Sequence, residues 1–318
     1  TITTTEMVRA LELAKASHMT ADYYLASAVP MGFELDGEGE WVQNPLNLSA
    51  HSLTGHYQLM MLPISTMQNL DRAIKGANIF VEKMVVSCLA TAESSLLKDE
   101  KEYGVCLLDI GAGTTNIAVY IEGQLALAHT IQRGGENVTR DIATVLQTTT
   151  EEAERLKLLH GCVDLQQVKP EHMIQFEAID GPQSISRIEL SDIIIARYEE
   201  ILHTVRTELE NKGALQSLYH GVVLAGDACQ IEGMVTLTRH ILGVSAHLGN
   251  SPLEVFAEDQ HLSVLRRSMY TTATGLLMFS QGDLQEAIEE PDTSGKRPFF
   301  ERVANGWSTF NDKLKSFF

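Results

Sequence analysis

The chain of 318 residues is 44% hydrophobic and 21% charged, and its formal net charge is −18. This composition is typical of a globular protein rather than a disordered one, and the length exceeds one ordinary hydrophobic core, which indicates at least two subdomains. The negative charge disfavours a nucleic-acid partner, because a basic face supplies most of the affinity for nucleic acid.

The cysteine and hydropathy patterns indicate the compartment and the kind of protein. The four cysteines are scattered and form no CxxC pair, which argues against a disulfide framework or a zinc site and favours a reducing, cytosolic compartment. No run of about eighteen apolar residues is present, so no membrane-spanning helix is predicted.

The first 83 residues are predicted to form a small α/β unit. Thr4 or Thr5 can cap an opening helix, whose face is given by apolar residues at helical spacing. Alternating apolar side chains from Tyr57 to Met61 predict a strand, and a second helical pattern begins over Asn69 to Lys75.

The middle of the chain is predicted to alternate between helices and strands. A Glu122-Gly123 pair separates two strand-like runs, which is typical of a hairpin turn. The expected elements, in chain order, are an apolar helix at 81–97, strands at 105–108, 115–120 and 124–131, helical sequence at 136–160, a helix capped by Ser191 that runs to about Leu209, a strand at 222–224 and a core helix at 269–279.

The stretch "DIGAGTT", which starts at Asp109, lies between two of the expected strands. Gly111 and Gly113 have no Cβ, so backbone N–H groups there can approach an anion closely, and the two threonines can add hydroxyl donors. Asp109, at the end of a strand, is positioned to hold a hydrated Mg²⁺. A plain hairpin, whose glycines only suit the turn, explains the same residues when the motif is taken alone.

A second small-residue turn follows the strand at 222–224, and several segments around both turns occur in a specific order. These segments are "KEYGVCLLDIGAGTTNIAVY", "RGGENVTRDIA", "TTTEEAERLKLLHGC" and "GVVLAGDACQIEGM". In this order and spacing they resemble the actin-like ATPase superfamily and, within it, the FtsA family of bacterial cell-division proteins. The resemblance covers nearly the whole chain, because "VQNPLNLSAHSLTGHYQLMMLPIS" is also similar to the family's extra subdomain, called 1C.

The resemblance implies an actin-like, ribonuclease-H-like α/β fold with an inserted small α/β subdomain. It also implies a division of the chain into subdomains 1A, 1C, 2A and 2B. The expected parts are an SHS2-like 1C at 1–83, a helix returning to 1A at 84–103, the first part of 2A at 104–135, 2B at 136–190, a return through 2B and 2A with an adenosine turn at 191–265, a 1A helix at 266–280, an acidic linker at 281–296 and a membrane-targeting amphipathic helix at 297–318.

The resemblance further implies a site for ATP and Mg²⁺. "DIGAGTT" would be the second phosphate loop, with Asp109 directed toward Mg²⁺ through water. Glu154 and Lys157 match helix positions that face the nucleoside, and their spacing puts them on one helix face; an exposed surface pair is the alternative. The expected nucleotide-binding residues are Asp109, Gly111, Ala112, Gly113, Thr114, Thr115, Gly134, Gly135, Glu154, Lys157, Gly226 and Asp227.

The sequence departs from the family pattern at the first phosphate loop and at the adenosine turn. These 318 residues contain no Asp-x-Gly-Thr/Ser hairpin that matches the family's first phosphate loop. In the adenosine turn the usual glycine triplet reads Gly226-Asp227-Ala228. The Asp227 carboxylate would repel an anionic ligand by roughly 2–4 kcal/mol before screening, at about 4–8 Å and an effective dielectric constant near 20. Weakened nucleotide binding is therefore expected unless this side chain turns outward.

A third departure concerns hydrolysis. In actin relatives a Gln or Glu on the helix before the phosphate hairpin orients the attacking water, and the matching position here is Ser87. Serine is a poor base, and water orientation with general acid–base help contributes about 10²–10⁴-fold to a rate. Glu93, roughly 9 Å further along the helix axis, is the alternative acid. The chain is expected to be at most a slow ATPase, with ATP acting as a structural or regulatory ligand.

The last residues are predicted to form a membrane-binding helix. From Lys296 to Phe318 there are five basic and two acidic residues, and apolar residues recur at spacings of 3 and 4. A basic, aromatic amphipathic helix suits an anionic membrane surface, whereas packing on its own domain or in a partner's groove is the alternative. The expected membrane-binding residues are Phe299, Phe300, Arg302, Val303, Trp307, Phe310, Lys313, Leu314, Lys315 and Phe317.

By resemblance, the protein would polymerise and tether filaments of the tubulin-like FtsZ to the cytoplasmic face of the bacterial inner membrane at the division septum. The FtsZ C-terminal peptide would dock within about residues 135–215, and 1C would contact the next subunit and other division proteins. Two alternatives stay open: a pilus-assembly protein similar to PilM, and a sugar kinase or polyphosphatase of the same superfamily.

Overall fold

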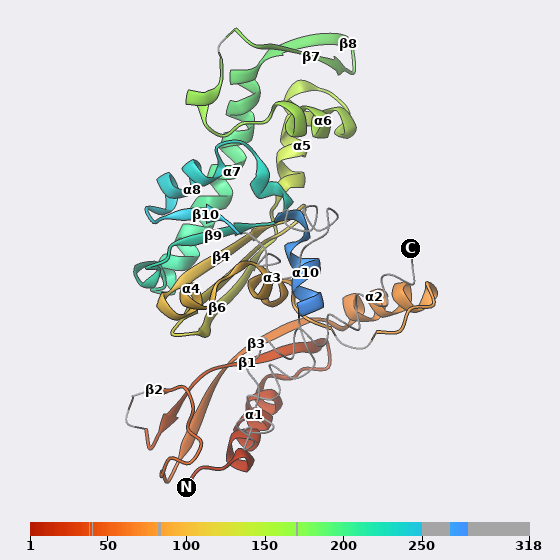
Figure 1. Cartoon of the computed structure of the whole chain (residues 1–318). Helices are drawn as coiled ribbons and strands as arrows, with labels where there is room; N and C mark the ends of the chain where they lie inside the picture. The colour runs from red at the N-terminus through yellow and green to blue at the C-terminus, as the bar shows by residue number, and fades with distance from the viewer. Residues whose placement is uncertain (38, 40, 82–83, 170, 250–267, 279–318) are drawn as a thin grey trace, which may run out of the picture. The chain divides into compact units, whose positions relative to one another are not determined.

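The computed structural model describes residues 1–249 and 268–278 except positions 38, 40, 82, 83 and 170 (Figure 1). The described residues divide into two compact units, one of Thr1–Val86 with Leu276–Met278, and one within Ser87–Gly275. The expected acidic linker at 281–296 and amphipathic helix at 297–318 lie outside the described residues. None of the described helices combines the length and apolar character that a membrane crossing needs.

The first unit is built on a three-stranded antiparallel sheet with strand order β2-β1-β3. A small core of Ile2, Met7 and Phe33 lies where helix α1 packs on strand β3. The elements of this unit are α1 (Thr4–His18), β1 (Tyr23–Leu35), β2 (Trp41–Val42), β3 (Leu53–Pro63) and α2 (Ile64–Gly76).

Strand β3 confirms the strand expected around Tyr57, but the other predictions for this unit are incomplete. Strand β1 is missing from the prediction because its pairing with β3 is interrupted by bulges between Leu25 and Ser27 and between Pro30 and Gly32, which break the two-residue alternation. Helix α1 is capped by Thr3 rather than by the threonines after it, because the Thr3 backbone N–H donates to Glu6 in a capping box.

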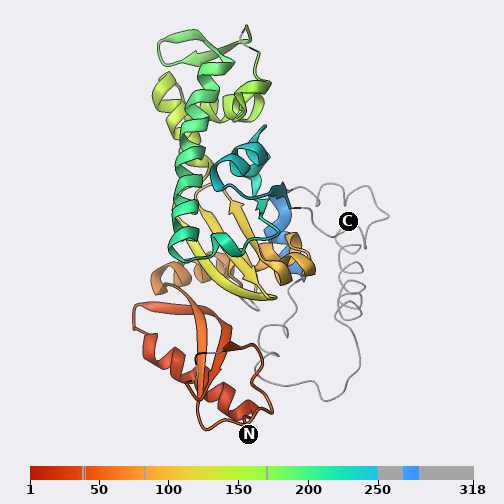
Figure 2. The ribbon, with the colours of Figure 1, turned by 90° about the vertical axis from the view of Figure 1, so that its left-hand side faces the viewer.

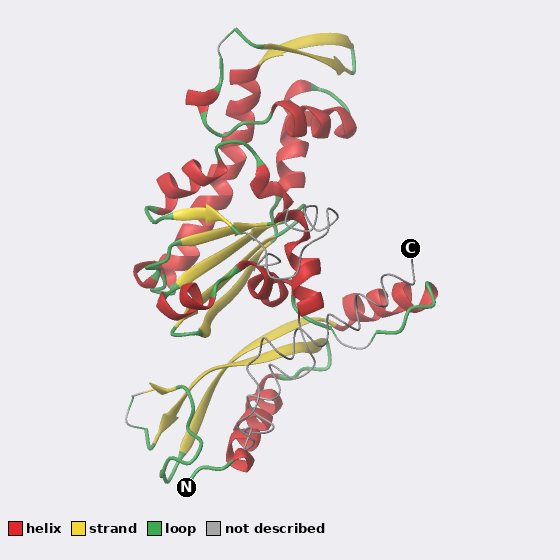
Figure 3. Ribbon diagram, viewed as in Figure 1, coloured by secondary structure: helices red, strands yellow, loops and turns green. Residues whose placement is uncertain are grey.

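The second unit contains a five-stranded sheet with strand order β10-β9-β4-β5-β6 (Figure 3). Its strands are β4 (Val105–Ile110), β5 (Thr115–Ile121), β6 (Gln124–Ile131), β9 (Val222–Ala225) and β10 (Ala246–Leu248). Strands β9 and β10 pair in parallel with their neighbours, whereas β4, β5 and β6 are antiparallel. Every residue of β4 is buried, as expected for a central strand of nearly continuous apolar sequence.

The strands predicted at 105–108, 115–120, 124–131 and 222–224 are confirmed, and so is the turn between β5 and β6. Glu122 and Gly123 both have positive φ, of 51° and 75°, which is the backbone that a two-residue hairpin turn with the right twist requires. The turn therefore joins β5 to β6 as an antiparallel pair, whose register shifts once, between Val119 and Tyr120.

Helices surround this sheet and extend beyond it, and the longest of them, α7, runs along it (Figure 2). A two-stranded antiparallel sheet, β7-β8, adds to the far part of the unit. The remaining elements are α3 (Ser87–Ser95), α4 (Lys98–Tyr103), α5 (Gly135–Leu146), α6 (Thr150–His160), η1 (Leu165–Gln167), β7 (Met173–Ala178), β8 (Gly181–Ser186), α7 (Arg187–Asn211), η2 (Leu215–Ser217), η3 (Asp227–Gln230), α8 (Met234–Leu242), η5 (Ser268–Tyr270) and α10 (Thr271–Met278), which crosses the boundary between the units.

Several predicted helix limits are wrong. Helix α3 begins at Ser87 rather than near residue 81. The helical sequence predicted at 136–160 is confirmed as two helices, which are separated where Gln147 adopts a left-handed backbone, and Thr149 caps the second of them. The prediction that Ser191 caps a helix is also wrong: Ser186 is the N-cap, with Glu189 completing a capping box, and Ser191 is buried inside α7.

Candidate nucleotide site

The hairpin between β4 and β5 presents a row of backbone N–H groups. Gly111 N–H donates to the Thr114 carbonyl at 2.9 Å and closes the turn. The N–H groups of Ala112, Gly113 and Thr114 donate no hydrogen bond to the residues that the structure describes. Successive free N–H groups in a tight turn form a concavity suited to an anion.

The N-terminus of α5 braces this hairpin from one side. The N–H groups of Gly135 and Glu136 donate to the carbonyls of Gly111 and Ala112 at 2.9 and 2.8 Å. A Cβ at Gly134 would lie 2.5 Å from the Gly111 carbonyl oxygen, so only glycine permits this approach. The buried Thr115 hydroxyl likewise supports the turn, because it donates to the Arg133 carbonyl at 2.8 Å.

Asp109 lies where the two small-residue turns meet. Strands β4 and β9 run parallel, with Asp109 opposite Ala225, so the turns after both strands emerge at the same carboxyl edge of the sheet. A Cβ on Gly226, whose φ is +86°, would lie 2.6 Å from a carboxylate oxygen of Asp109. Burial raises the pKa of Asp109, against the hydrogen bonds that its carboxylate accepts from Thr91 and Asn116.

The predicted Glu154–Lys157 pair lies next to the N-terminus of α5, which contacts the hairpin. The Lys157 ammonium contacts Glu154 Oε2 at 2.7 Å, Thr139 Oγ1 at 2.9 Å and the Gly135 carbonyl at 3.2 Å. Burial would raise the pKa of Glu154, but the hydrogen bonds from Lys157 and Thr139 outweigh it and lower that pKa. Both side chains of the pair therefore reach from α6 to α5, with Lys157 largely covered and Glu154 partly exposed.

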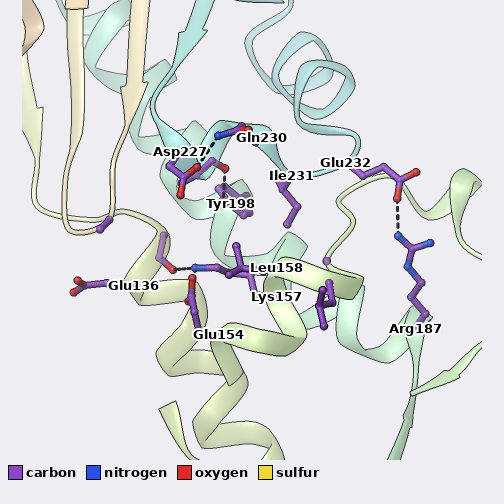
Figure 4. A pocket seen from close by; sticks show the side chains of 15 residues that line it. Glu136, Glu154, Lys157, Leu158, Arg187, Tyr198, Asp227, Gln230, Ile231 and Glu232 are labelled. Atoms are coloured by element: carbon purple, nitrogen blue, oxygen red, sulfur yellow. Dashed lines mark hydrogen bonds and ion pairs between the residues drawn. The ribbon is translucent and has the colours of Figure 1, made fainter. Parts of the chain in front are cut away.

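A cavity of about 660 Å³ borders the hairpin at Ala112 and the Glu154–Lys157 pair, and it lies entirely within the second unit (Figure 4). Five of its lining residues were predicted from the sequence, namely Ala112, Gly135, Glu154, Lys157 and Asp227. The other lining residues are Glu136, Leu158, Leu159, Gly161, Arg187, Tyr198, Ala228, Gln230, Ile231 and Glu232.

The remaining predicted residues are not among those that line the cavity. They gather around the hairpin and the second turn, as the contacts of Asp109 with Gly226 and of Gly134 with Gly111 show. These residues are Asp109, Gly111, Gly113, Thr114, Thr115, Gly134 and Gly226.

A second ion pair lies at another part of the cavity wall. An Arg187 guanidinium nitrogen contacts Glu232 at 2.5 Å, and Arg187 Nε donates to the carbonyl of His160, the last residue of α6. Figure 4 shows this pair well apart from Glu154 and Lys157. Arg187 therefore ties the ends of α6 and α7 to the segment that follows η3.

Asp227 lines the cavity while its carboxylate is partly engaged. Gln230 Nε2 donates to Asp227 Oδ1 at 2.6 Å, an interaction visible in Figure 4. Beneath this turn the Tyr198 hydroxyl donates to the Ala228 carbonyl at 2.8 Å. Gln230 gives the Asp227 carboxylate a hydrogen bond but no positive charge to offset it at the cavity wall.

The side chains of Ser87 and Glu93, the two candidates for positioning a water molecule, are each engaged by another residue. Ser87 Oγ accepts a hydrogen bond of 3.4 Å from Asn116 Nδ2. Glu93 contacts the Lys101 ammonium at 2.7 Å, so its carboxylate is directed to α4.

Sequence reasoning missed Thr139 and Arg187, both of which make polar contacts at the site. Thr139 lies four residues after Gly135 on α5, and only the packing of α5 on α6 brings it to Glu154. Arg187 had a readable signal, because it directly follows the serine of an S-x-x-E capping pattern. Its role as a link to Glu232 depends on tertiary contacts across 45 residues.

Comparison with known proteins identifies the family of this chain. A family model described as "Cell division protein FtsA" matches residues 106–275. The chain is 30% identical over 276 residues to the cell division protein FtsA of Pseudomonas aeruginosa, which covers 86% of this chain and 65% of that protein. It is 32% identical to the Agrobacterium fabrum protein of the same name, over 87% of this chain and 62% of the relative. The chain thus spans slightly less than two thirds of the length of these two relatives.

Solved structures share the fold at lower identity. An MreB5 structure from Spiroplasma citri bound to ADP superimposes with a TM-score of 0.56 at 17% identity, covering 71% of this chain and 67% of that chain. A PilM-PilN type IV pilus biogenesis complex superimposes with a TM-score of 0.63, also at 17% identity, covering 91% and 74%. The sequence match and the shared architecture lead to one conclusion: the chain belongs to the FtsA family of cell-division proteins and has an actin-like fold.

Proposed function

We propose that this protein binds ATP with Mg²⁺ in the cavity of the second unit and uses it to support assembly at the bacterial division site. The observation that carries the proposal is the convergence of a hairpin with free N–H groups, a buried carboxylate and a polar cavity. One neighbour of the fold was solved with ADP and another with AMPPNP, which supports a nucleotide as the ligand.

The residues present fit such a ligand. The N–H groups of Ala112, Gly113 and Thr114 would hold phosphate oxygens, since they have no other acceptor among the described residues. No group of three or more His, Cys, Asp or Glu side chains in the described residues is arranged to hold a metal ion. This agrees with Mg²⁺ held mainly by water and phosphate oxygens, with Asp109 as a single carboxylate partner.

The order of groups along the cavity also matches the order of parts in a nucleotide. A Cβ on Gly135 would lie 3.6 Å from Lys157 Nζ and 3.7 Å from the Gly111 carbonyl oxygen, so the Glu154–Lys157 pair borders the hairpin. We therefore assign this pair to the sugar, which follows the phosphates. The apolar part of the lining, which includes Leu158 and Ile231, is left for the base.

Hydrolysis is proposed to be slow. Ser87 cannot serve as a strong base, and the Glu93 carboxylate is paired with Lys101. The bound nucleotide would then act by linkage: it stabilises the state that binds it by RT ln(1 + [L]/Kd). ATP in this role favours one conformation for assembly and does not require turnover.

At the level of the cell, we propose that the protein polymerises and anchors FtsZ filaments to the cytoplasmic face of the inner membrane, helping to recruit later division proteins. The FtsZ C-terminal peptide would dock within residues 135–215, and the first unit would contact the next subunit. The basic aromatic tail at 297–318 would bind lipid. Family membership at about 30% identity favours this role over a PilM-like role or a sugar kinase.

The nucleotide part of the proposal is tested by equilibrium binding of ATP to the full-length protein in the presence of Mg²⁺. Saturable binding at one site per chain is expected, together with an increase in unfolding temperature as ATP is added. Binding that is absent at millimolar ATP would contradict the proposal.

A further inference from the structure

Thr139 connects the two side chains assigned to the sugar, although it does not line the cavity. It is 3% exposed on α5, and its hydroxyl oxygen accepts from the Lys157 ammonium at 2.9 Å. The same hydroxyl contacts Glu154 Oε2 and, at 3.2 Å, the Gly135 carbonyl. A hydroxyl has one proton, and the charged carboxylate is the stronger acceptor, so Thr139 donates to Glu154.

The ammonium of Lys157 has no donor left for a ligand in this arrangement. It carries three N–H bonds, and it has three acceptors: Glu154, Thr139 and the Gly135 carbonyl. Its side chain is only 12% exposed, whereas that of Glu154 is 42% exposed. Glu154 Oε1 accepts no hydrogen bond from the residues that the structure describes, so it is the free acceptor of the pair.

We propose that Thr139 is a positioning residue for sugar recognition: its buried hydroxyl fixes the Glu154 carboxylate so that the second oxygen accepts a hydrogen bond from a ribose hydroxyl. Without this hydroxyl, Glu154 Oε2 keeps only Lys157 as a partner, and the carboxylate can rotate about its terminal torsion, which is broad. The inference rests on the proposed function, because it requires a nucleotide in the cavity.

The test compares ATP with 2′,3′-dideoxy-ATP, which lacks both ribose hydroxyls, by equilibrium binding to the full-length protein. The unaltered protein is expected to prefer ATP by about tenfold or more, since a hydrogen bond to a charged group is typically of that strength. Thr139→Val is nearly isosteric and removes only the hydroxyl; the ratio of the two Kd values is expected to fall to within about twofold of one. Thr139→Ala should give the same ratio, and Thr139→Ser should restore the preference.

Thr238→Val is the matched control. Thr238 is also fully buried in a helix, and its hydroxyl donates to the Met234 carbonyl at 2.8 Å, but it does not line the cavity. This variant should keep the ratio of the unaltered protein, because a general loss of stability weakens both ligands equally.

The outcomes separate this inference from the proposed function. Absence of ATP binding by the unaltered protein would contradict the proposed function itself. ATP binding without preference over the dideoxy analogue would overturn the contact of Glu154 with ribose and with it the role of Thr139. A preference that survives in both Thr139→Val and Thr139→Ala would overturn the role of Thr139 alone, and neither result contradicts nucleotide binding. A lost preference in these variants that serine restores supports it.

Discussion

At the scale of single residues, Asp227 distinguishes this site most clearly, because it places a carboxylate beside a cavity proposed to hold an anion. Asp227→Asn keeps the size and an oxygen that Gln230 can still donate to, but removes the charge. The side chain is exposed, so solvent screens much of the repulsion. We therefore expect the variant to bind ATP more tightly than the unaltered protein, by at most about tenfold. Calorimetric titration with ATP measures the change.

Adenosine serves as the control ligand for Asp227→Asn, because it lacks the phosphates. Its affinity should change far less than that of ATP if repulsion of the phosphates is the cause. An ATP affinity that is equal in the two proteins would show that the Asp227 carboxylate does not oppose nucleotide binding.

At the scale of secondary structure elements, the structure shows which of two serines caps α7. Ser186→Ala removes the N-cap and is expected to reduce the free energy of unfolding by about 1 kcal/mol. Ser191→Ala removes a buried hydroxyl that has no hydrogen-bond partner in the described residues, so its effect should be close to zero or stabilising. Urea denaturation of both variants measures the difference, and a larger loss for Ser191→Ala would contradict the assigned cap.

The strands show how far the sequence predicts this fold. The strands β4, β5, β6 and β9 follow from apolar runs and a two-residue turn, because these signals are local. Strand β1 is hidden by bulges at Pro30 and Gly32. The hairpin β7-β8 was also missed, although β7 alternates buried and exposed residues, because the strands are short and lie between stronger helical signals.

For the candidate site, the sequence predicted residues that belong to motifs of the family it resembles. The hairpin after Asp109 and the Glu154–Lys157 pair belong to this class. Thr139 and the Arg187–Glu232 pair could not be predicted in the same way, because each acts through a partner on another element. Helix packing, which no single motif encodes, brings these groups together.

At the scale of the whole molecule, the tail should decide where the protein is found. Residues 296–318 carry three net positive charges, from five basic and two acidic residues, whereas the rest of the chain carries −21. A version that ends at Gly295 is therefore expected to lose flotation with vesicles of anionic lipid, while the full-length protein floats and is released by salt. Equal flotation of the two proteins would contradict membrane binding by the tail.

The central claim is that the cavity beside the hairpin binds ATP through its own side chains. The most direct measurement is the Kd for ATP with Mg²⁺ of the full-length protein, of Glu154→Ala and of Glu151→Ala, which lies on the same helix but does not line the cavity. We predict saturable binding at one site, a loss of about tenfold or more in Glu154→Ala, and no comparable loss in Glu151→Ala. An equal Kd for all three proteins, or no saturable binding by the unaltered protein, would contradict the account.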